Sequence, residues 1–256
     1  MKRITSILFV LLLMLASFTA GVEYERGDVD QNGSVNIADV ATLIDYLLTG
    51  TWGDEPVTPP DIHEYVDLGL PSGTLWATCN IGANNPEDYG DYFAWGETEP
   101  KDNYGWSTYK WCNGDFDALT KYCADSSFGT VDNKTKLEPG DDAAFVNWGD
   151  KWRMPTYDQQ TELRTKCIWT WTTRNGVDGR LVTGPNGASL FLPAAGLRNN
   201  GSHFFEGTYG YYWSCSLSTS GPAYAFSMDF DSVAVYLGSL HRNFGFTVRP
   251  VRVPQE

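Results

Sequence analysis

The most regular pattern of hydrophobic and polar positions lies near the C-terminal end of the chain. Large apolar side chains alternate with small or acidic ones over residues 224–231, and the same period of two recurs over 233–237 and 244–248. A short apolar run covers residues 189–192. A period of two is typical of antiparallel strands that bury one face. We therefore predict a strand in each of these four segments.

Helical patterns are few in this part of the chain. A short helix is predicted over residues 141–147, because acidic residues at its start suit the positive end of the helix dipole. A second helix is predicted from Thr156 to about Lys166, since Gln159 stands three residues after Thr156 and completes a capping box. Two helices followed by a strand meander predict an α+β domain with irregular loops.

A pattern of oxygen-bearing residues fills the segment 28–39. Oxygen donors fall at positions 1, 3, 5, 7, 9 and 12, the seventh through its backbone carbonyl: Asp28, Asp30, Asn32, Ser34, Asn36 and Asp39. This is the ligand spacing of a 12-residue calcium loop, and Gly33 at position 6 allows its sharp turn. The sequence therefore predicts one Ca²⁺ site.

One amphipathic helix is predicted directly after this loop. Its apolar stripe has the spacing i, i+3, i+4, i+7 and consists of Val40, Leu43, Ile44 and Leu47. Gly50 is the expected C-terminal stop. No helical pattern precedes the loop, and the loop ends in Asp rather than the Glu of an ordinary helix-loop-helix hand. Residues 27–50 therefore resemble one dockerin type I repeat.

This resemblance implies a protein partner. Dockerins bind cohesins, and residues at loop positions 10 and 11, here Ile37 and Ala38, help to select the cohesin. The family normally carries two repeats whose helices pack together, whereas this chain shows one. A single helix of about twelve residues is marginal in water, so the apolar stripe needs a cover. Three covers remain open: the chain's own N-terminal and linker residues, a second copy of the protein, or a cohesin-like partner.

The remaining boundaries follow from composition. Residues 1–21 combine Lys2 and Arg3 with an apolar run and small residues, which predicts a secretory signal peptide too short to span a membrane. The calcium module then covers 22–50. A Pro-rich linker is predicted over 51–62 and the large domain over 63–253. We expect a protein secreted from the cell or held at its surface, with the periplasm as an alternative, and no membrane insertion once the signal is removed.

Charge and cysteine content narrow the function classes further. The formal net charge of −14 makes nucleic acid and anionic membrane poor partners. The five cysteines leave at least one thiol unpaired, and no Cys-x-x-Cys motif is present for a zinc ribbon or a thioredoxin site. Cys112 and Cys123 are the candidate disulfide pair, across one loop, with Cys79 and Cys167 as the weaker alternative.

A second resemblance covers nearly all of residues 63–253. It is carried by six segments, 65–80, 86–97, 152–156, 191–196, 212–214 and 248–251. These resemble the Fibrobacter succinogenes major paralogous domain, which is abundant in exported proteins of the Bacteroidetes. The resemblance implies a C-type-lectin-like, sulfatase-modifying-factor-like fold, and it implies no defined activity.

Catalytic and lectin motifs find little support. The histidines 63, 203 and 241 lack metal-ligand spacing, and no nucleophile elbow, phosphate-binding loop or His-Glu-x-x-His motif is present. The nearest approaches to the calcium triplets of animal C-type lectins are residues 99–101 and 148–150, which we interpret as loop structure. We therefore predict a non-catalytic protein.

Aromatic residues are the remaining candidates for binding. Trp106, Tyr109, Trp111 and Tyr122 occupy one polar loop region, and Trp169 and Trp171 share one strand face. Such side chains either fill a core that is poor in aliphatic helices or form platforms for sugar rings and protein partners. The loops 104–137 and 198–209 are the best candidates for a variable binding surface.

The sequence thus favours an exported, two-module recognition and attachment protein that binds glycan or protein through the large domain. Two alternatives remain. One is an accessory component or glycoside hydrolase of a polysaccharide-degrading system, which a pair of neighbouring carboxylates in a cleft would favour. The other is a structural subunit of a surface layer or fibre, which self-association would favour.

Overall fold

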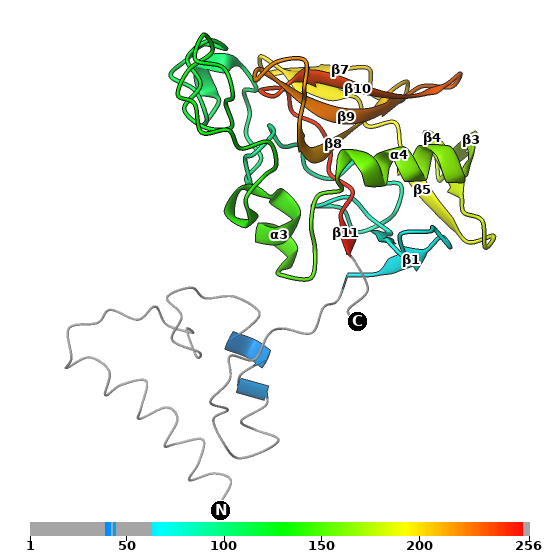
Figure 1. The fold of residues 1–256 in the computed structure, drawn as a ribbon. Helices are drawn as coiled ribbons and strands as arrows, with labels where there is room; N and C mark the ends of the chain where they lie inside the picture. Colours follow the sequence, from blue (N-terminus) through cyan, green and yellow to red (C-terminus); the bar gives the residue numbers. More distant parts are fainter. Residues whose placement is uncertain (1–38, 42, 45–62, 253–256) are drawn as a thin grey trace, which may run out of the picture. The chain divides into compact units, whose positions relative to one another are not determined.

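The computed structural model describes residues 39–41, 43–44 and 63–252, and the chain divides into two compact units, 1–62 and 63–256 (Figure 1). In the first unit, residues 39–41 and 43–44 are helical, as predicted. The predicted signal peptide and Pro-rich linker lie outside the described residues. No helix among the described residues is long and apolar enough to cross a membrane.

The described part of the second unit is mainly β-structure with few helices. One sheet holds β8 (Gly210–Leu217), β9 (Tyr224–Phe230) and β10 (Val235–His241) in the order β10-β9-β8, and a second holds β3 (Ile168–Arg174), β4 (Val177–Thr183) and β5 (Ser189–Pro193). A third joins β1 (Tyr65–Asp67) and β11 (Val251–Arg252) to β2 (Leu75–Ala77), and β6 (Leu197–Asn199) pairs with β7 (Ser202–Phe204). Neighbouring strands in each sheet are antiparallel.

Three of the four predicted strands are confirmed, as β5, β9 and β10. The strand predicted over residues 244–248 is wrong. Gly245, Phe246 and Thr247 instead form isolated bridges to Arg198, Phe93 and Tyr212, which belong to three different segments. The alternation of buried residues is real there, but a regular ladder needs one continuous partner strand.

Both predicted helices are present. α4 (Tyr157–Lys166) begins after Thr156, whose side chain accepts a hydrogen bond from the Gln159 backbone N–H in a complete capping box. α3 (Ala143–Trp148) starts two residues later than predicted, because Asp141 belongs to a preceding 3-10 turn. Asp142 is the N-cap of α3, and its carboxylate accepts hydrogen bonds from the N–H groups of Ala144 and Phe145.

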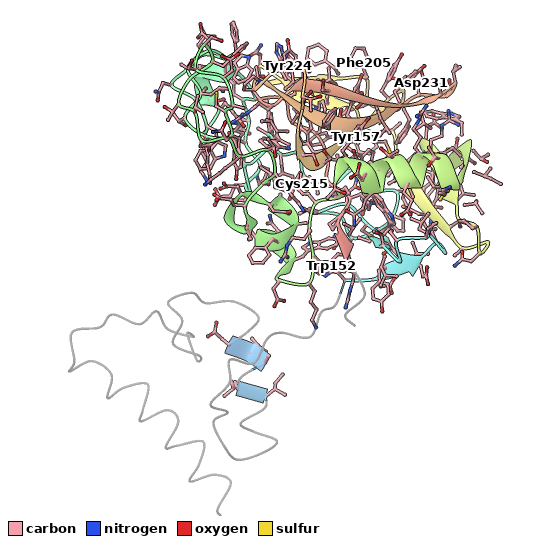
Figure 2. The ribbon with its side chains drawn as sticks, viewed as in Figure 1. Trp152, Tyr157, Phe205, Cys215, Tyr224 and Asp231 are labelled. Atoms are coloured by element: carbon pink, nitrogen blue, oxygen red, sulfur yellow. The ribbon has the colours of Figure 1, made fainter. Side chains whose placement is uncertain are left out.

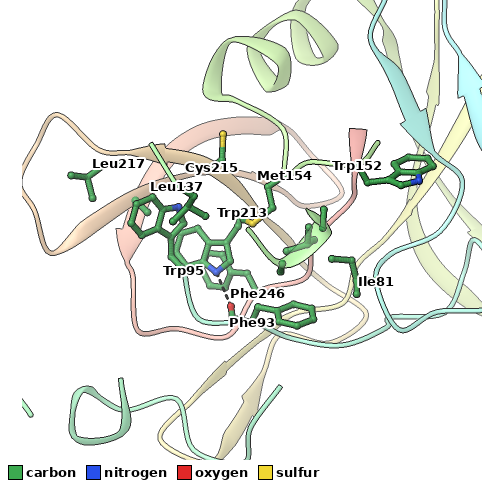
Figure 3. Packing of buried hydrophobic residues seen from close by; sticks show 14 of the residues in the cluster. Ile81, Phe93, Trp95, Leu137, Trp152, Met154, Trp213, Cys215, Leu217 and Phe246 are labelled. Atoms are coloured by element: carbon green, nitrogen blue, oxygen red, sulfur yellow. Dashed lines mark hydrogen bonds between the residues drawn. The ribbon is translucent and has the colours of Figure 1, made fainter. Parts of the chain in front are cut away.

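Two aromatic-rich clusters form the core around the β8–β9–β10 sheet. On one side, Leu163 of α4 packs with Tyr212, Met228 and Phe230, and Figure 1 shows α4 beside this sheet. Trp213, from the other side of the sheet, stacks on Phe246 at 4.0 Å between ring centroids (Figure 3). The Trp213 indole N–H donates to the Phe93 carbonyl at 2.9 Å, so the polar group of this large core residue has a hydrogen-bond partner.

The predicted disulfide is not formed. Cys112 and Cys123 are free thiols in the structure, as are the alternative pair. The Cys112 Sγ lies 3.1 Å from the Trp106 carbonyl and the Cys123 Sγ 3.0 Å from the Asp125 carbonyl. Each thiol therefore donates a hydrogen bond to a carbonyl close to it in the chain, and the two sulfur atoms are not bonded to each other.

Candidate ligand-binding surfaces

Of the predicted calcium ligands, the described residues include only Asp39. It is buried, at 3% exposure, and it opens the described helical segment. A buried carboxylate at the junction of loop and helix fits the twelfth ligand position of a calcium loop. The other five ligands, Asp28, Asp30, Asn32, Ser34 and Asn36, lie outside the described residues, as do Ile37, Ala38 and Leu47.

The helix that follows carries apolar surface. Val40 and Ile44, one turn apart, are about half exposed, whereas Leu43 is partly buried. Two exposed apolar side chains at i and i+4 lie on one helix face. This part of the predicted partner-binding stripe is therefore accessible within the described residues.

The loop region 104–137, hereafter the aromatic loop, is tied into the core. Tyr104, Tyr109 and Tyr122 are buried, and their hydroxyls donate to the carbonyls of Tyr92 and Trp95 and to the carboxylate of Asp141, at 2.5, 2.6 and 2.5 Å. Burial raises the pKa of all three hydroxyls. Trp111 and Trp106 are partly buried, so most of this region's aromatic surface is structural rather than available to a ligand.

Arg242 anchors the aromatic loop from the far side. Its fully buried guanidinium donates to the Tyr109 hydroxyl at 2.7 Å and to the carbonyls of Lys121, Tyr122 and Pro222 at 2.7–2.9 Å. A buried cation is stable only when its donors are satisfied. Here the acceptors include backbone carbonyls of the loop, so the burial of the cation and the conformation of the loop depend on each other.

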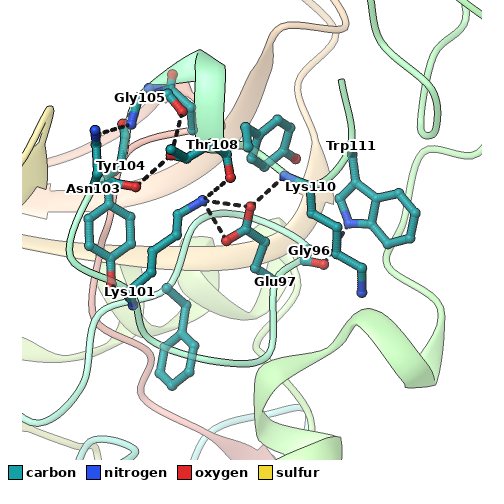
Figure 4. Close-up of polar contacts among 12 residues, drawn as sticks. Gly96, Glu97, Lys101, Asn103, Tyr104, Gly105, Thr108, Lys110 and Trp111 are labelled. Atoms are coloured by element: carbon teal, nitrogen blue, oxygen red, sulfur yellow. Dashed lines mark hydrogen bonds and ion pairs between the residues drawn. The ribbon is translucent and has the colours of Figure 1, made fainter. Parts of the chain in front are cut away.

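Glu97 also holds part of the aromatic loop in place, near residues 99–101. Its carboxylate accepts hydrogen bonds from the Lys101 ammonium at 2.8 Å and the Lys110 backbone N–H at 2.7 Å (Figure 4). Lys101 also donates to the Thr108 carbonyl at 2.9 Å. These contacts support the interpretation of residues 99–101 as loop structure, and no group of three or more potential metal ligands occurs among the described residues.

A second aromatic group is partly exposed: Phe205 and Tyr236 are about half exposed, whereas Tyr209 and Tyr211 are partly buried, and the Tyr211 ring lies 5.1 Å from that of Phe246. It starts at the β6–β7 hairpin and comprises Phe205, Tyr209, Tyr211 and Tyr236, hereafter the aromatic face. The Tyr209 and Tyr211 rings stack at 6.0 Å with 21° between their planes, and Phe205 lies 5.4 Å from Tyr209. Among the described residues, no hydrogen bond involves the hydroxyl of any of these tyrosines.

Phe205 has an unusual backbone. Its φ is +62°, in the left-handed region that bulky residues rarely adopt, and its side chain is 52% exposed. The turn is held by the N–H groups of Thr208 and Tyr209, which donate to the Phe205 carbonyl at 3.0 Å. A strained backbone that displays a phenyl ring to solvent is a candidate binding feature.

Asp229 lies at the centre of the aromatic face. In the register of the sheet it stands directly opposite Tyr211 of β8 and Tyr236 of β10. Cross-strand neighbours share one face of a sheet, so the three side chains form a row, tyrosine–aspartate–tyrosine. This is the face opposite Phe226, which packs on Tyr157 of α4 at 4.2 Å. In Figure 2, Phe205 and Asp231 lie across the sheet from Tyr157.

The Asp229 carboxylate has few protein partners. Oδ1 accepts a hydrogen bond from the Ser227 hydroxyl at 2.8 Å, and Oδ2 has no hydrogen-bond donor among the described residues. Burial raises the pKa of this carboxyl to about 7. Oδ2 points toward Gly238, where a Cβ atom would come to 3.5 Å of it, so the absence of a side chain leaves room beside the carboxylate.

Two residues of this row were missed by sequence reasoning. The pattern over 224–231 placed Asp229 and Asp231 opposite the large apolar residues, and the loop 198–209, predicted as a candidate binding surface, is mostly exposed. Tyr211 and Tyr236 could not be assigned to the same site, because only the strand register brings them to either side of Asp229.

Two of the cavities in the described domain lie away from this row of residues. The larger, about 510 Å³, is lined by residues that include Arg153, Met154 and Cys215, and the smaller, about 270 Å³, by residues that include Lys101, Arg198 and His203. Arg198 pairs with Glu206 at 2.7 Å, and Lys101 pairs with Glu97 at 2.7 Å. The cations of the smaller cavity thus already have partners.

The comparisons with known proteins concern two segments. A family model described as Dockerin type I domain matches residues 26–64. Another, described as Domain of unknown function (DUF8237), matches residues 161–251, from α4 to the first residue of β11. No curated protein and no solved structure matches the chain.

The dockerin resemblance is therefore supported, and the matched segment contains the whole predicted calcium loop. It also extends beyond the predicted end of the repeat, through the predicted linker to residue 64. The Fibrobacter succinogenes paralogous domain is not confirmed by these matches and stays a prediction.

Proposed function

We propose that this protein is an exported recognition and attachment protein. Its dockerin-like module binds Ca²⁺ through residues 28–39 and docks to a cohesin-like partner outside the cell or at its surface. The observation that carries the proposal is the dockerin type I match over residues 26–64, since the ligand spacing and the helix lie within it. Dockerin domains in general bind calcium and cohesins and occur in extracellular or cell-surface proteins.

The large domain is, in this proposal, the part that recognises a ligand without chemical conversion. Burial raises the pKa of Cys167 to about 11 and that of Cys215 to about 12, which argues against a thiol nucleophile at either position near neutral pH. The C-type-lectin-like arrangement belongs to the same proposal. Its support is the content of two helices, short sheets and long irregular loops in the described domain.

The attachment role is tested with the full chain and a panel of type I cohesin domains. We expect capture in calcium and none in chelator, because the loop orders its ligands only around the ion. Asp28→Asn with Asp39→Asn removes two of the loop's three carboxylates and should abolish calcium binding in calorimetry. Asp54→Asn with Asp61→Asn changes the charge equally outside the loop and should bind calcium as the natural chain does.

The helix face has its own test. Val40→Asp with Ile44→Asp places charge on two exposed apolar positions and should remove cohesin capture while calcium affinity stays within about threefold. Capture that is unchanged in this variant, or absent from the natural chain with every cohesin in the panel, contradicts the attachment role. The natural chain could instead self-associate in a concentration-dependent way that the variant abolishes. That result would identify a second copy of the protein as the partner that covers the apolar stripe.

A second candidate function, glycoside hydrolysis, has one specific observation in its favour. Asp229 stands near the end of β9, and Asp231 lies two residues further on, just beyond the strand and roughly 7 Å along the chain. Burial raises the pKa of Asp229, whereas the N–H groups of Val233 and Ala234 lower that of Asp231. Two carboxyls with divergent pKa values are the usual pair of a glycosidase. Release of reducing ends from a soluble β-glucan, lost in Asp229→Asn, would establish this function in place of simple recognition.

A further inference from the structure

We propose that the row Tyr211–Asp229–Tyr236 is a carbohydrate-binding subsite for a neutral polysaccharide chain. The proposal rests on the recognition function proposed for the large domain and names its surface and ligand class. Three features of the described domain support it: partly exposed aromatic rings, an under-bonded carboxylate and the sign of the surrounding charge.

The first feature is the pair of tyrosines. Strands in a sheet are about 4.8 Å apart, so Tyr211 and Tyr236, on the two strands that flank β9, stand roughly 10 Å apart on one face. A pyranose ring with equatorial substituents has a flat face of C–H groups, which carry partial positive charge and suit the negative face of an aromatic ring. Tyr209 and Phe205 continue the aromatic face beyond Tyr211. A linear chain of several sugar rings can therefore contact two or more platforms at once.

The second feature is the Asp229 carboxylate between the tyrosines. Most carboxylates that leave water gain several donors from the protein, but Asp229 gains the Ser227 hydroxyl as its one hydrogen-bond donor among the described residues. A polysaccharide supplies vicinal hydroxyl groups, which would donate to the free Oδ2. Gly238 leaves the necessary space beside that oxygen.

The third feature selects a neutral ligand. Asp229 lies on this face, and the chain carries a net charge of −14. Across from Asp229, β8 and β10 present tyrosines and no cation. An anionic polysaccharide such as a uronate would meet like charge without a counterion. Neutral glycans with flat ring faces, the β-linked glucans and xylans, fit the site better.

The contrast with the aromatic loop supports this choice of surface. Its tyrosine hydroxyls are already bonded to main-chain carbonyls or a buried carboxylate, so ligand binding there would break core contacts. The hydroxyls of Tyr211 and Tyr236 have no hydrogen-bond partner among the described residues. They can donate to or accept from sugar hydroxyls at no such cost.

The test uses the full chain in affinity gel electrophoresis with soluble mixed-linkage β-glucan and xylan, and with polygalacturonate as the anionic probe. We expect retardation by a neutral glycan and none by polygalacturonate. Tyr236→Ala should weaken the binding about tenfold, and Tyr211→Ala with Tyr236→Ala should abolish it. Tyr65→Ala is the matched control, because Tyr65 is 48% and Tyr236 49% exposed, on different sheets.

The outcomes separate this inference from the attachment role. Asp28→Asn with Asp39→Asn should bind glycan normally, since the subsite contains no predicted calcium ligand. Circular dichroism and thermal denaturation confirm that each tyrosine variant is folded. If neither neutral glycan binds, or if Tyr236→Ala and Tyr65→Ala bind equally well, the subsite is wrong. Cohesin capture is measured separately, so the attachment role would stand or fall on its own result.

Discussion

The aromatic loop and the aromatic face have similar residue types but differ in the hydrogen bonding of their tyrosine hydroxyls. In the aromatic loop, Tyr104, Tyr109 and Tyr122 are buried, and each hydroxyl both donates and accepts a hydrogen bond. In the aromatic face, Tyr211 and Tyr236 lie on either side of a carboxylate with a single bonded donor, and their hydroxyls are unpaired among the described residues. Aromatic composition therefore does not identify a binding surface in this protein. The hydrogen bonding of the polar groups beside the rings does.

The largest expected effect tests whether the aromatic loop is a structural element. Arg242→Met removes a buried cation and leaves four protein acceptors without their donor. We expect the free energy of unfolding to fall by about 3–5 kcal/mol, measured by urea denaturation at pH 7. Arg174→Met is the control, because Arg174 is a surface residue whose ion pair with Glu87 should contribute less than about 1 kcal/mol. Equal losses in the two variants would contradict the structural role.

The second prediction tests the under-bonded carboxylate of the aromatic face. The folded pKa of Asp229 is raised to about 7, above the ordinary value of 3.8 that applies to the unfolded chain. Between these values the folded state holds the additional proton, so this group's contribution to stability falls as the pH rises through that window. Above it, the loss reaches about 2–4 kcal/mol. Asp229→Asn should therefore become more stable relative to the natural chain between pH 4.5 and pH 8.

Asp231→Asn is the matched control, with the opposite sign. Backbone N–H groups lower the pKa of Asp231, so its stabilisation is present at neutral pH and is lost as the pH falls. Urea denaturation of the two variants at both pH values measures the difference. If the stability of Asp229→Asn relative to the natural chain does not change with pH, the carboxylate has more water or more hydrogen-bond donors around it than in this structure.

The smallest effect sharpens the comparison at the level of single hydroxyls. Tyr122→Phe removes the donor to Asp141 and the acceptor for the Glu138 N–H inside the core, and it should cost about 1–2 kcal/mol of unfolding free energy. Tyr236→Phe removes a hydroxyl without a described partner and should change stability by less than about 0.5 kcal/mol. Thermal denaturation of both variants checks this, and equal costs would show that the two regions do not differ in hydrogen bonding.

Much of the local structure was predictable from sequence. The capping box at Thr156 and Gln159 positioned α4 correctly, because its hydrogen bonds connect residues three apart. The alternation over 224–231 identified β9. It also placed Asp229 and Phe230 on opposite faces of that strand, because the side-chain period of a strand is intrinsic to its backbone. The spacing of oxygen donors over 28–39 identified the dockerin-like segment, which the family match supports. In each case, the physical cause lies within about a dozen residues.

Other properties were decided by tertiary structure. Residues 244–248 have the pattern of a strand but meet three different partner segments. Cys112 and Cys123 lie near each other in sequence, but the fold leaves both as free thiols. The aromatic loop is held in the core because Arg242, more than a hundred residues away in the chain, donates hydrogen bonds to its backbone carbonyls. The aromatic face exists because the register of β8, β9 and β10 sets two tyrosines on either side of Asp229. Register depends on contacts between distant segments, and no local pattern specifies it.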